Sequence, residues 1–220
     1  MKKKLIIFGN TQQAELATFF FEKDSDYEIV AYTADHEYLS ADTFLGKPNI
    51  PFEKISSLYD QKNHDMFIAI GYSKMNSIRE QKYIEAKRKG YSLASYISSK
   101  CTLLTDYPLG DNCFILEDNT IQPFVKIGNN VTLWSGNHIG HHSVIEDHNF
   151  ISSHVVISGN CVIKKNCFIG VNATIHNEVL MEEKNLIAAG AIITSSTQPK
   201  QVYLPQKSSV FKKSSDQLNF

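Results

Sequence analysis

The chain has 220 residues, enough for two small domains that each bury a core of their own, and two domains are expected. Its 22 basic and 23 acidic residues balance almost completely and form no basic stripe, so we expect neither nucleic acid nor a membrane as a partner. The apolar run at residues 5–8 is too short for a signal-peptide core or a membrane span, and the four cysteines contain no C-x-x-C pair. A cytoplasmic protein with free thiols is therefore expected.

The first ninety or so residues alternate apolar runs with helical stretches. Strands are predicted at residues 5–8, 28–32 and 66–70, and helices at about residues 12–22 and 75–89. Strands that alternate with helices form a parallel sheet, so a small Rossmann-like α/β domain is expected over residues 1–95. Ligands of such sheets bind beyond the carboxyl ends of the strands, which here means residues 9–13, 33–35 and 71–73.

The turn after the first strand reads Gly9-Asn10-Thr11-Gln12-Gln13-Ala14. It keeps only the first glycine of the G-x-G-x-x-G dinucleotide motif, so it does not predict a close backbone approach to a pyrophosphate. Two interpretations stay open on this motif: a nucleotide-sized ligand at this edge of the sheet, or a glycine that merely ends a strand.

A six-residue period occupies the C-terminal half. From position 109 to 193 every sixth residue is Ile, Leu or Met, fifteen in succession, and four residues after each comes a smaller one such as Cys113, Val125 or Ala173. This pattern predicts a left-handed parallel β-helix of about five triangular coils, uninterrupted by long loops between about residues 109 and 193, in a domain expected over residues 96–195. We expect the large side chains to fill the corners, the small ones to complete the flat walls, and pairs such as Asn129-Asn130 to form the turns. Residues 196–220 break the period and are expected to form an irregular tail over the last coil.

Five of the eight histidines gather in the middle of the repeats: His138, His141, His142, His148 and His154. One hypothesis is a zinc site, which resemblance to the trimeric γ-class carbonic anhydrases would imply. His142, His148 and His154 share one phase of the repeat, so they would lie at successive corners, whereas zinc needs three or four ligands at about 2 Å. The sequence therefore favours no metal site.

The other hypothesis is a single general base, because imidazole titrates near neutrality. His141 follows the inward Ile139 by two residues, and Gly140 before it is expected to leave room for a ligand. The alternative for His141 is a surface histidine that caps a turn, which is the expected role of His138, His148 and His154.

Three segments carry a resemblance to a known family: Phe8-Gly9-Asn10-Thr11, Phe67-Ile68-Ala69-Ile70-Gly71 and Ile139-Gly140-His141-His142-Ser143-Val144-Ile145. In this order they resemble the bacterial nucleotide-sugar acyltransferases, among them the bacillosamine-pathway and perosamine N-acetyltransferases and proteins labelled sialic-acid O-acetyltransferases. The resemblance extends to about residue 195. It implies that the N-terminal domain holds a nucleotide-linked amino sugar, that acetyl-CoA lies between two β-helices of a homotrimer, and that a histidine, here His141, deprotonates the sugar amine.

Carried over by position, the resemblance assigns the nucleotide-sugar contacts to Asn10, Thr11, Gln12, Gln13, Thr33, Asp35 and Gly71. The acetyl-CoA contacts fall on Val171 and Ala189, for which ordinary repeat packing is the alternative, and on Phe150, where some relatives place a histidine near the thioester carbonyl. His142 joins His141 as a catalytic candidate, although many relatives have an acid there that raises the basicity of the base. Gln12-Gln13 replaces a glycine-rich turn with a histidine, so the sugar contacts are expected to differ.

The resemblance implies an acetyl-CoA-dependent transferase that N-acetylates a nucleotide-linked 4-amino-4,6-dideoxyhexose for a bacterial surface polysaccharide, such as the O-antigen of lipopolysaccharide. The amine would attack the thioester directly, with His141 as general base and backbone amides stabilising the oxyanion. Inward-facing Cys113, Cys161 and Cys167 would be poor nucleophiles, which argues against an acyl-enzyme. Two alternatives stay open: a sugar O-acetyltransferase, and a non-catalytic solenoid that binds a nucleotide sugar.

Overall fold

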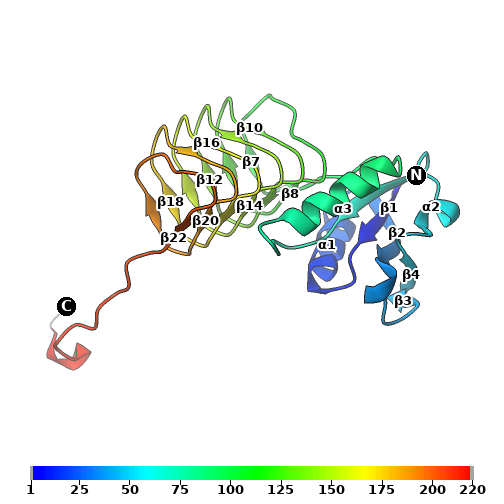
Figure 1. The fold of residues 1–220 in the computed structure, drawn as a ribbon, viewed down its shortest axis with the longest axis horizontal. Coiled ribbons are helices and arrows are strands. Elements are labelled where there is room, and N and C mark those ends of the chain that lie inside the picture. The colour runs from blue at the N-terminus through cyan, green and yellow to red at the C-terminus, as the bar shows by residue number, and fades with distance from the viewer. Residues whose placement is uncertain (1, 219–220) are drawn as a thin grey trace.

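The computed structural model describes residues 2–218, in which an α/β unit is followed by a column of stacked coils (Figure 1). The sheet of the α/β unit has the strand order β3-β4-β2-β1-β5, with β3 antiparallel to β4 and the other pairs parallel. Its elements are β1 (Lys3–Phe8), α1 (Gln12–Lys23), β2 (Tyr27–Ala34), the 3-10 turn η1 (His36–Tyr38), β3 (Thr43–Phe44), β4 (Lys47–Pro51), α2 (Ile55–Leu58), β5 (His64–Ile68) and α3 (Ser77–Arg88). The predicted Rossmann-like class is confirmed.

Two differences from the prediction concern the strands of the sheet. β3 and β4 were not predicted because Lys47-Pro48-Asn49-Ile50-Pro51 contains no apolar run and β3 has only two residues; β4 lies between β2 and β3, which forms the edge of the sheet. The third predicted strand begins and ends two residues earlier, as β5.

Gly9 does more than end a strand. Its φ is +135°, and a Cβ there would lie 2.8 Å from the carbonyl oxygen of Ala69. The glycine therefore lets the segments after β1 and β5 meet at the point where the strand order reverses, which is where open α/β sheets form their ligand crevice.

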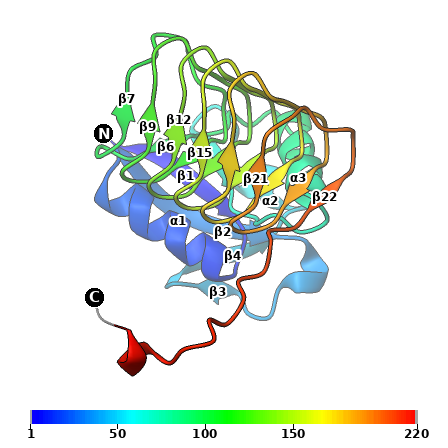
Figure 2. The same cartoon turned by 90° about the vertical axis from the view of Figure 1, so that its left-hand side faces the viewer.

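The column is a three-sided β-helix, seen with its coils one behind another and α1 below them in Figure 2. Face I contains β6 (Tyr96–Ile97), β8 (Phe114–Ile115), β11 (Thr132–Leu133), β14 (Phe150–Ile151), β17 (Phe168–Ile169), β20 (Leu186–Ile187) and β22 (Val202–Tyr203). Face II contains β7 (Thr102–Leu103), β9 (Thr120–Ile121), β12 (His138–Ile139), β15 (Val156–Ile157), β18 (Thr174–Ile175) and β21 (Ile192–Ile193). Face III contains β10 (Lys126–Ile127), β13 (Val144–Ile145), β16 (Val162–Ile163) and β19 (Leu180–Met181). Paired residues stand one coil of eighteen residues apart, as Ile139 and Ile157 do, so the predicted left-handed hexapeptide β-helix is confirmed.

The large and small residues of the repeat form one continuous core. Every ladder residue from Ile115 to Ile193 is buried, as are the small residues between them, and Leu109 packs against the end of this core. The positions expected for the large and the small residues were wrong. The large residues lie in the flat strands and not at the corners, and each small residue directly follows a corner. The corners belong to residues in the left-handed region, such as Asn130 with a φ of 56° and Gly136 with a φ of 77°.

The tail differs from its expected course. β22 pairs with β20, and Gln201 donates its backbone N–H to Asn185 Oδ1, so residues 196–203 do close the last coil. Residues 204–218 run away from the column and include a 3-10 turn, η2 (Ser215–Gln217) (Figure 1). Within residues 2–218 the structure contains no helix with the length and apolar character of a membrane span. The expected domain limits near residues 95 and 195 stay predictions.

The α/β unit is docked on face I and on the corner between faces III and I. Tyr72 packs on Phe150 and Phe168 of face I, at ring-centroid distances of 5.0 and 4.5 Å. Arg79 of α3 is fully buried at the corner, where its Nη2 donates to the carbonyl oxygens of Asn130, His148 and Asn149. Burial lowers the pKa of Arg79 to about 9, which still leaves the guanidinium charged at neutral pH. The two parts of the chain therefore share a packed junction.

Candidate active site

The carboxyl edge of the sheet carries most of the predicted nucleotide-sugar residues. Asn10 and Thr11 follow β1, Gln12 and Gln13 begin α1, Asp35 follows β2, and Gly71 lies three residues after β5. Asn10 donates its Nδ2 to the carbonyl oxygen of Tyr38 at 2.8 Å, and a Cβ at Gly71 would meet no described atom within 4 Å. These residues are brought to one edge, with open space around Gly71.

Thr33 does not join them. Its side chain is fully buried, and its hydroxyl donates to the carbonyl oxygen of Ile50 at 2.7 Å. This bond ties β2 to β4, so the structure gives Thr33 a packing role in place of the expected ligand contact.

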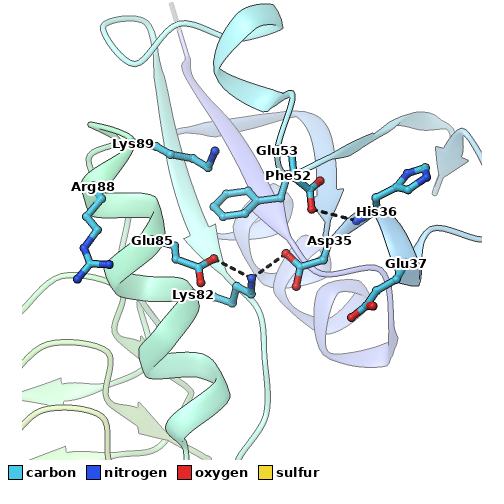
Figure 3. A pocket seen from close by; sticks show the side chains of 9 residues that line it. All are labelled: Asp35, His36, Glu37, Phe52, Glu53, Lys82, Glu85, Arg88 and Lys89. Carbon is cyan, nitrogen blue, oxygen red and sulfur yellow. Dashed lines mark hydrogen bonds and ion pairs between the residues drawn. The ribbon is translucent and has the colours of Figure 1, made fainter.

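A pocket of about 630 Å³ opens beside Asp35, between the end of β2 and the second half of α3 (Figure 3). Lys82 lies between two carboxylates there, with its Nζ 2.7 Å from both Asp35 Oδ1 and Glu85 Oε2. Burial works against the charge of Lys82, but the bonds to Asp35 and Glu85 outweigh it and raise the pKa of this amine. The sequence reasoning missed Lys82 and Glu85, although their spacing on a predicted helix places them on one face.

The pocket carries charges of both signs. Its cations are Lys82, Arg88 and Lys89, and its carboxylates are Asp35, Glu37, Glu53 and Glu85. Because Asp35 and Glu85 already bind Lys82, the lining has no excess of positive charge, and Arg88 and Lys89 are the cations without such a carboxylate pair. A carboxylate at the end of a strand, as Asp35 is, can accept hydrogen bonds from ribose hydroxyls.

His141 lies on the corner between faces II and III, and its side chain is exposed. Its ring lies over Gly159 of the next coil, where an added Cβ would come within 2.7 Å of His141 Cε1 and 2.8 Å of Nε2. Gly159, which the sequence reasoning missed, thus leaves the space that the imidazole occupies; the available signal was a glycine eighteen residues after a histidine. Gly140 has another role than expected, since a Cβ there would collide with the backbone of Ser158 and Gly159.

His142 lies beside His141, with 3.1 Å between their Nδ1 atoms. It has a φ of 59°, and its ring contacts that of Phe124 at a centroid distance of 4.6 Å. If Nδ1–H of His141 donates to Nδ1 of His142, the Nε2 lone pair of His141 is free to accept a proton. In that tautomer the pair consists of an oriented base and its hydrogen-bond acceptor.

The three residues assigned to acetyl-CoA are not brought together. Val171 and Ala189 are exposed and lie one coil apart on the corner between faces I and II, so face II separates them from His141. Phe150 is only 4% exposed, because Tyr72 covers it and the Arg79 guanidinium lies 5.6 Å from its ring centroid. The structure therefore gives Phe150 a role in the junction and not the expected contact with acetyl-CoA.

His141 and the crevice of the same chain face different ways. The α/β unit covers face I and the corner between faces III and I, whereas the corner of His141 is opposite face I in the triangular section. The α/β unit and the His141 of one chain therefore lie on different sides of the column.

The remaining histidines and the cysteines have other surroundings. His142, His148 and His154 lie at three different corners, and within residues 2–218 no three His, Cys, Asp or Glu side chains form a group that could hold a metal ion. His138 and His154 are exposed, but the expectation of a surface role is wrong for His148, which is buried in the junction. Burial raises the pKa of the thiols of Cys113 and Cys167 to about 12, so these sulfurs are poor nucleophiles.

The repeats match a known family. The family of bacterial transferase hexapeptide repeats (six repeats) matches residues 109–141, 125–159 and 142–177, so this part of the column is built from repeats of this class. A comparison with curated protein sequences finds no match.

Solved structures share the whole arrangement of α/β unit and β-helix. The acetyltransferase domain of PglB from Neisseria gonorrhoeae FA1090 is 19% identical, with a TM-score of 0.81 over 93% of this chain and 100% of that one. A histidine-to-asparagine mutant of perosamine N-acetyltransferase from Caulobacter crescentus, in complex with CoA and GDP-perosamine, is 17% identical, with a TM-score of 0.78 over 90% of this chain and 92% of that one. WeeI from Acinetobacter baumannii AYE is 19% identical, with a TM-score of 0.74 over 89% of this chain and 92% of that one. At these identities the likeness establishes the fold.

Proposed function

We propose that the chain is an acetyl-CoA-dependent N-acetyltransferase acting on a nucleotide-linked amino sugar, of the 4-amino-4,6-dideoxyhexose kind, for a bacterial surface polysaccharide such as the O-antigen of lipopolysaccharide. The observation that carries the proposal is the exposed imidazole of His141 over Gly159, with His142 as its partner. It stands in a fold shared with the PglB acetyltransferase domain, solved with acetyl-CoA, and with perosamine N-acetyltransferase, solved with CoA and GDP-perosamine.

The proposed reaction is a direct transfer. The neutral sugar amine attacks the thioester carbonyl carbon, a C–N bond forms, and backbone N–H groups of the β-helix stabilise the oxyanion. His141 Nε2 takes the proton from the nitrogen, and the collapse of the intermediate breaks the C–S bond and releases CoA. Proton transfer from His141 to the departing sulfur restores the base. The high pKa values of the buried cysteine thiols support a route without an acyl-enzyme.

The site needs more than one copy of the chain. Because His141 is opposite face I, we propose that the nucleotide sugar held by the α/β unit of one copy meets His141 of a neighbour in a homotrimer. Acetyl-CoA would lie in the groove between the two columns, along the exposed corner of Val171 and Ala189. A cytoplasmic location remains part of the proposal.

Substitutions of His142 are expected to change kcat in opposite directions. Glycine and aspartate both tolerate its φ of 59°, so neither should disturb the corner. His142→Gly removes the acceptor for His141 Nδ1–H and should lower kcat about five- to tenfold, since a neutral hydrogen bond contributes about 1 kcal/mol. His142→Asp supplies a carboxylate that stabilises the imidazolium and should raise kcat several-fold. Steady-state kinetics at saturating substrates would check both; equal rates in the two variants would show that His142 does not orient the base.

The proposed function is tested by the release of CoA thiol from acetyl-CoA with dTDP-, UDP- and GDP-linked 4-amino sugars, next to their 4-hydroxy counterparts and sialic acid. Release that requires both an amino sugar and acetyl-CoA, with an N-acetyl product by mass spectrometry, is the expected result. Release with the hydroxyl acceptors alone would make the chain an O-acetyltransferase. Binding of a nucleotide sugar without any turnover would make it a binding module.

A further inference from the structure

A column of buried polar side chains runs along the corner between faces III and I, under α3. Its members stand one coil apart and all have left-handed backbone, with φ values between 53° and 62°: Asn112, Asn130, His148 and Asn166. Asparagine is well suited to such a position because its short amide bonds to neighbouring backbone and side chains. His148 is thus a titratable group in a column that is otherwise made of asparagine.

A series of hydrogen bonds connects this column to the sheet, and each group in it donates to the next. The backbone N–H of Ile68 donates to Asn112 Oδ1 at 2.8 Å, Asn112 Nδ2 donates to Asn130 Oδ1 at 2.8 Å, and Asn130 Nδ2 lies 2.9 Å from His148 Nδ1. A backbone N–H can only donate, so the N–H of Ile68 requires an acceptor, which is Asn112 Oδ1. This determines the orientation of the side-chain amide of Asn112, and through it that of Asn130. His148 Nδ1 must therefore accept, so the imidazole is neutral and carries its proton on Nε2, which faces Glu80 Oε1 at 3.7 Å.

We infer that the docking of the α/β unit on the β-helix requires neutral His148, which makes the junction a pH-sensitive contact. A proton on Nδ1 would face the Asn130 amide N–H, so that two donors oppose each other in a buried site. Rotation of the Asn130 amide would move the conflict to Asn112, and rotation of Asn112 would move it to the Ile68 N–H. Each arrangement leaves one buried pair of donors without an acceptor, which destabilises the docked state.

Charged and titratable groups surround His148 from both sides of the junction. They are Arg79, Glu80 and Tyr83 on α3, and Asp147 and Lys165 on the corner of the β-helix. Burial has the largest effect and lowers the pKa of His148; Glu80 and Asp147 work against this, and Arg79 and Lys165 add to it. Since the docked form binds the proton less well than the open form, docking is fully stable above the ordinary value of 6.5 and weakens as the pH falls below it.

The column ends where the crevice begins. Ile68 is the last residue of β5, and Ala69 to Gly71 follow it at the carboxyl edge of the sheet. Protonation of His148 would therefore loosen the part of the α/β unit that borders the crevice. This inference goes beyond the proposed function and stands without it.

The test is the hydrogen-exchange protection factor of the Ile68 amide in the full chain, between pH 7.5 and pH 5.5. In the natural protein we expect protection to fall by up to about tenfold per pH unit below 6.5, because one proton is linked to the opening. His148→Asn keeps the acceptor, suits a φ of 62°, and should make the protection independent of pH. His154→Asn is the matched control: His154 has a φ of 58° and the same phase of the repeat, but it is exposed, so the natural pH dependence should persist.

Constant protection in the natural protein, or an unchanged pH dependence in His148→Asn, would overturn the inference. Imidazole nitrogen NMR of the natural protein gives a second measurement that needs no variant. The Nε2–H tautomer of His148 at pH 7.5 is the expected result, and an Nδ1–H tautomer or a charged ring would contradict the direction of the hydrogen bonds.

Discussion

His141→Asn should lower kcat for acetyl transfer about 10³-fold, because a positioned general base contributes between about 10² and 10⁴ to the rate. The amide of asparagine cannot take the proton from the attacking amine, yet it is smaller than imidazole and leaves the corner over Gly159 free. We expect the melting temperature and acetyl-CoA affinity to remain those of the natural protein. Thiol release and isothermal titration, measured on one preparation, would separate the loss of chemistry from a loss of binding.

His138→Asn is the matched control for His141→Asn. His138 is exposed and lies three residues earlier on β12, outside the corner. Its substitution should leave kcat within about twofold, as is usual for surface changes away from a site. Undiminished transfer by His141→Asn would remove His141 from the mechanism.

Gly159→Ala should lower kcat about 100-fold while the fold stays intact. The new methyl group would lie within 3 Å of the His141 ring, so the ring must turn away, and a displacement of about 1 Å is enough to cost a factor of this size. The φ of Gly159 is not positive, so alanine causes no backbone strain there. Kinetics and thermal unfolding of the same sample are the measurements.

Gly140→Ala gives the contrast. Its methyl group would collide with the backbone of Ser158 and Gly159, which cannot rotate away as a side chain does, so this variant should lose thermal stability first. An active Gly159→Ala enzyme with a native melting temperature would show that the position of the His141 ring over Gly159 is unimportant for transfer.

The sequence predicted the fold well because its strongest signals are periodic. A segment with an isoleucine at every sixth position can bury all of these side chains only in a three-sided column. The exposed position of His141 then follows from its phase in the repeat. The α/β unit followed from apolar strands that alternate with helices. β4 escaped prediction because a five-residue strand with two prolines carries no such signal.

The site was harder to predict because contacts between distant segments decide it. Phe150 has the outward phase of the repeat, and its ring is covered by Tyr72 and Arg79 of the docked α/β unit. His148 has the same phase in the repeat as the exposed His154, but α3 covers His148 and leaves His154 uncovered. The repeat pattern predicts whether a side chain points into or out of the column, but it does not predict which other segment of the chain covers that side chain.

The most direct test of the proposed site is complementation between two inactive variants. The His141→Asn variant lacks the base. In the Gly71→Arg variant, the arginine side chain should fill the open edge of the crevice without a clash at its Cβ, because no described atom lies within 4 Å of that position. Co-expressed with different tags and purified as mixed oligomers, the two variants should regain a substantial part of the natural activity, because some pairs of neighbours combine an intact crevice with an intact His141. Mixed oligomers no more active than either variant alone would contradict a site shared between copies.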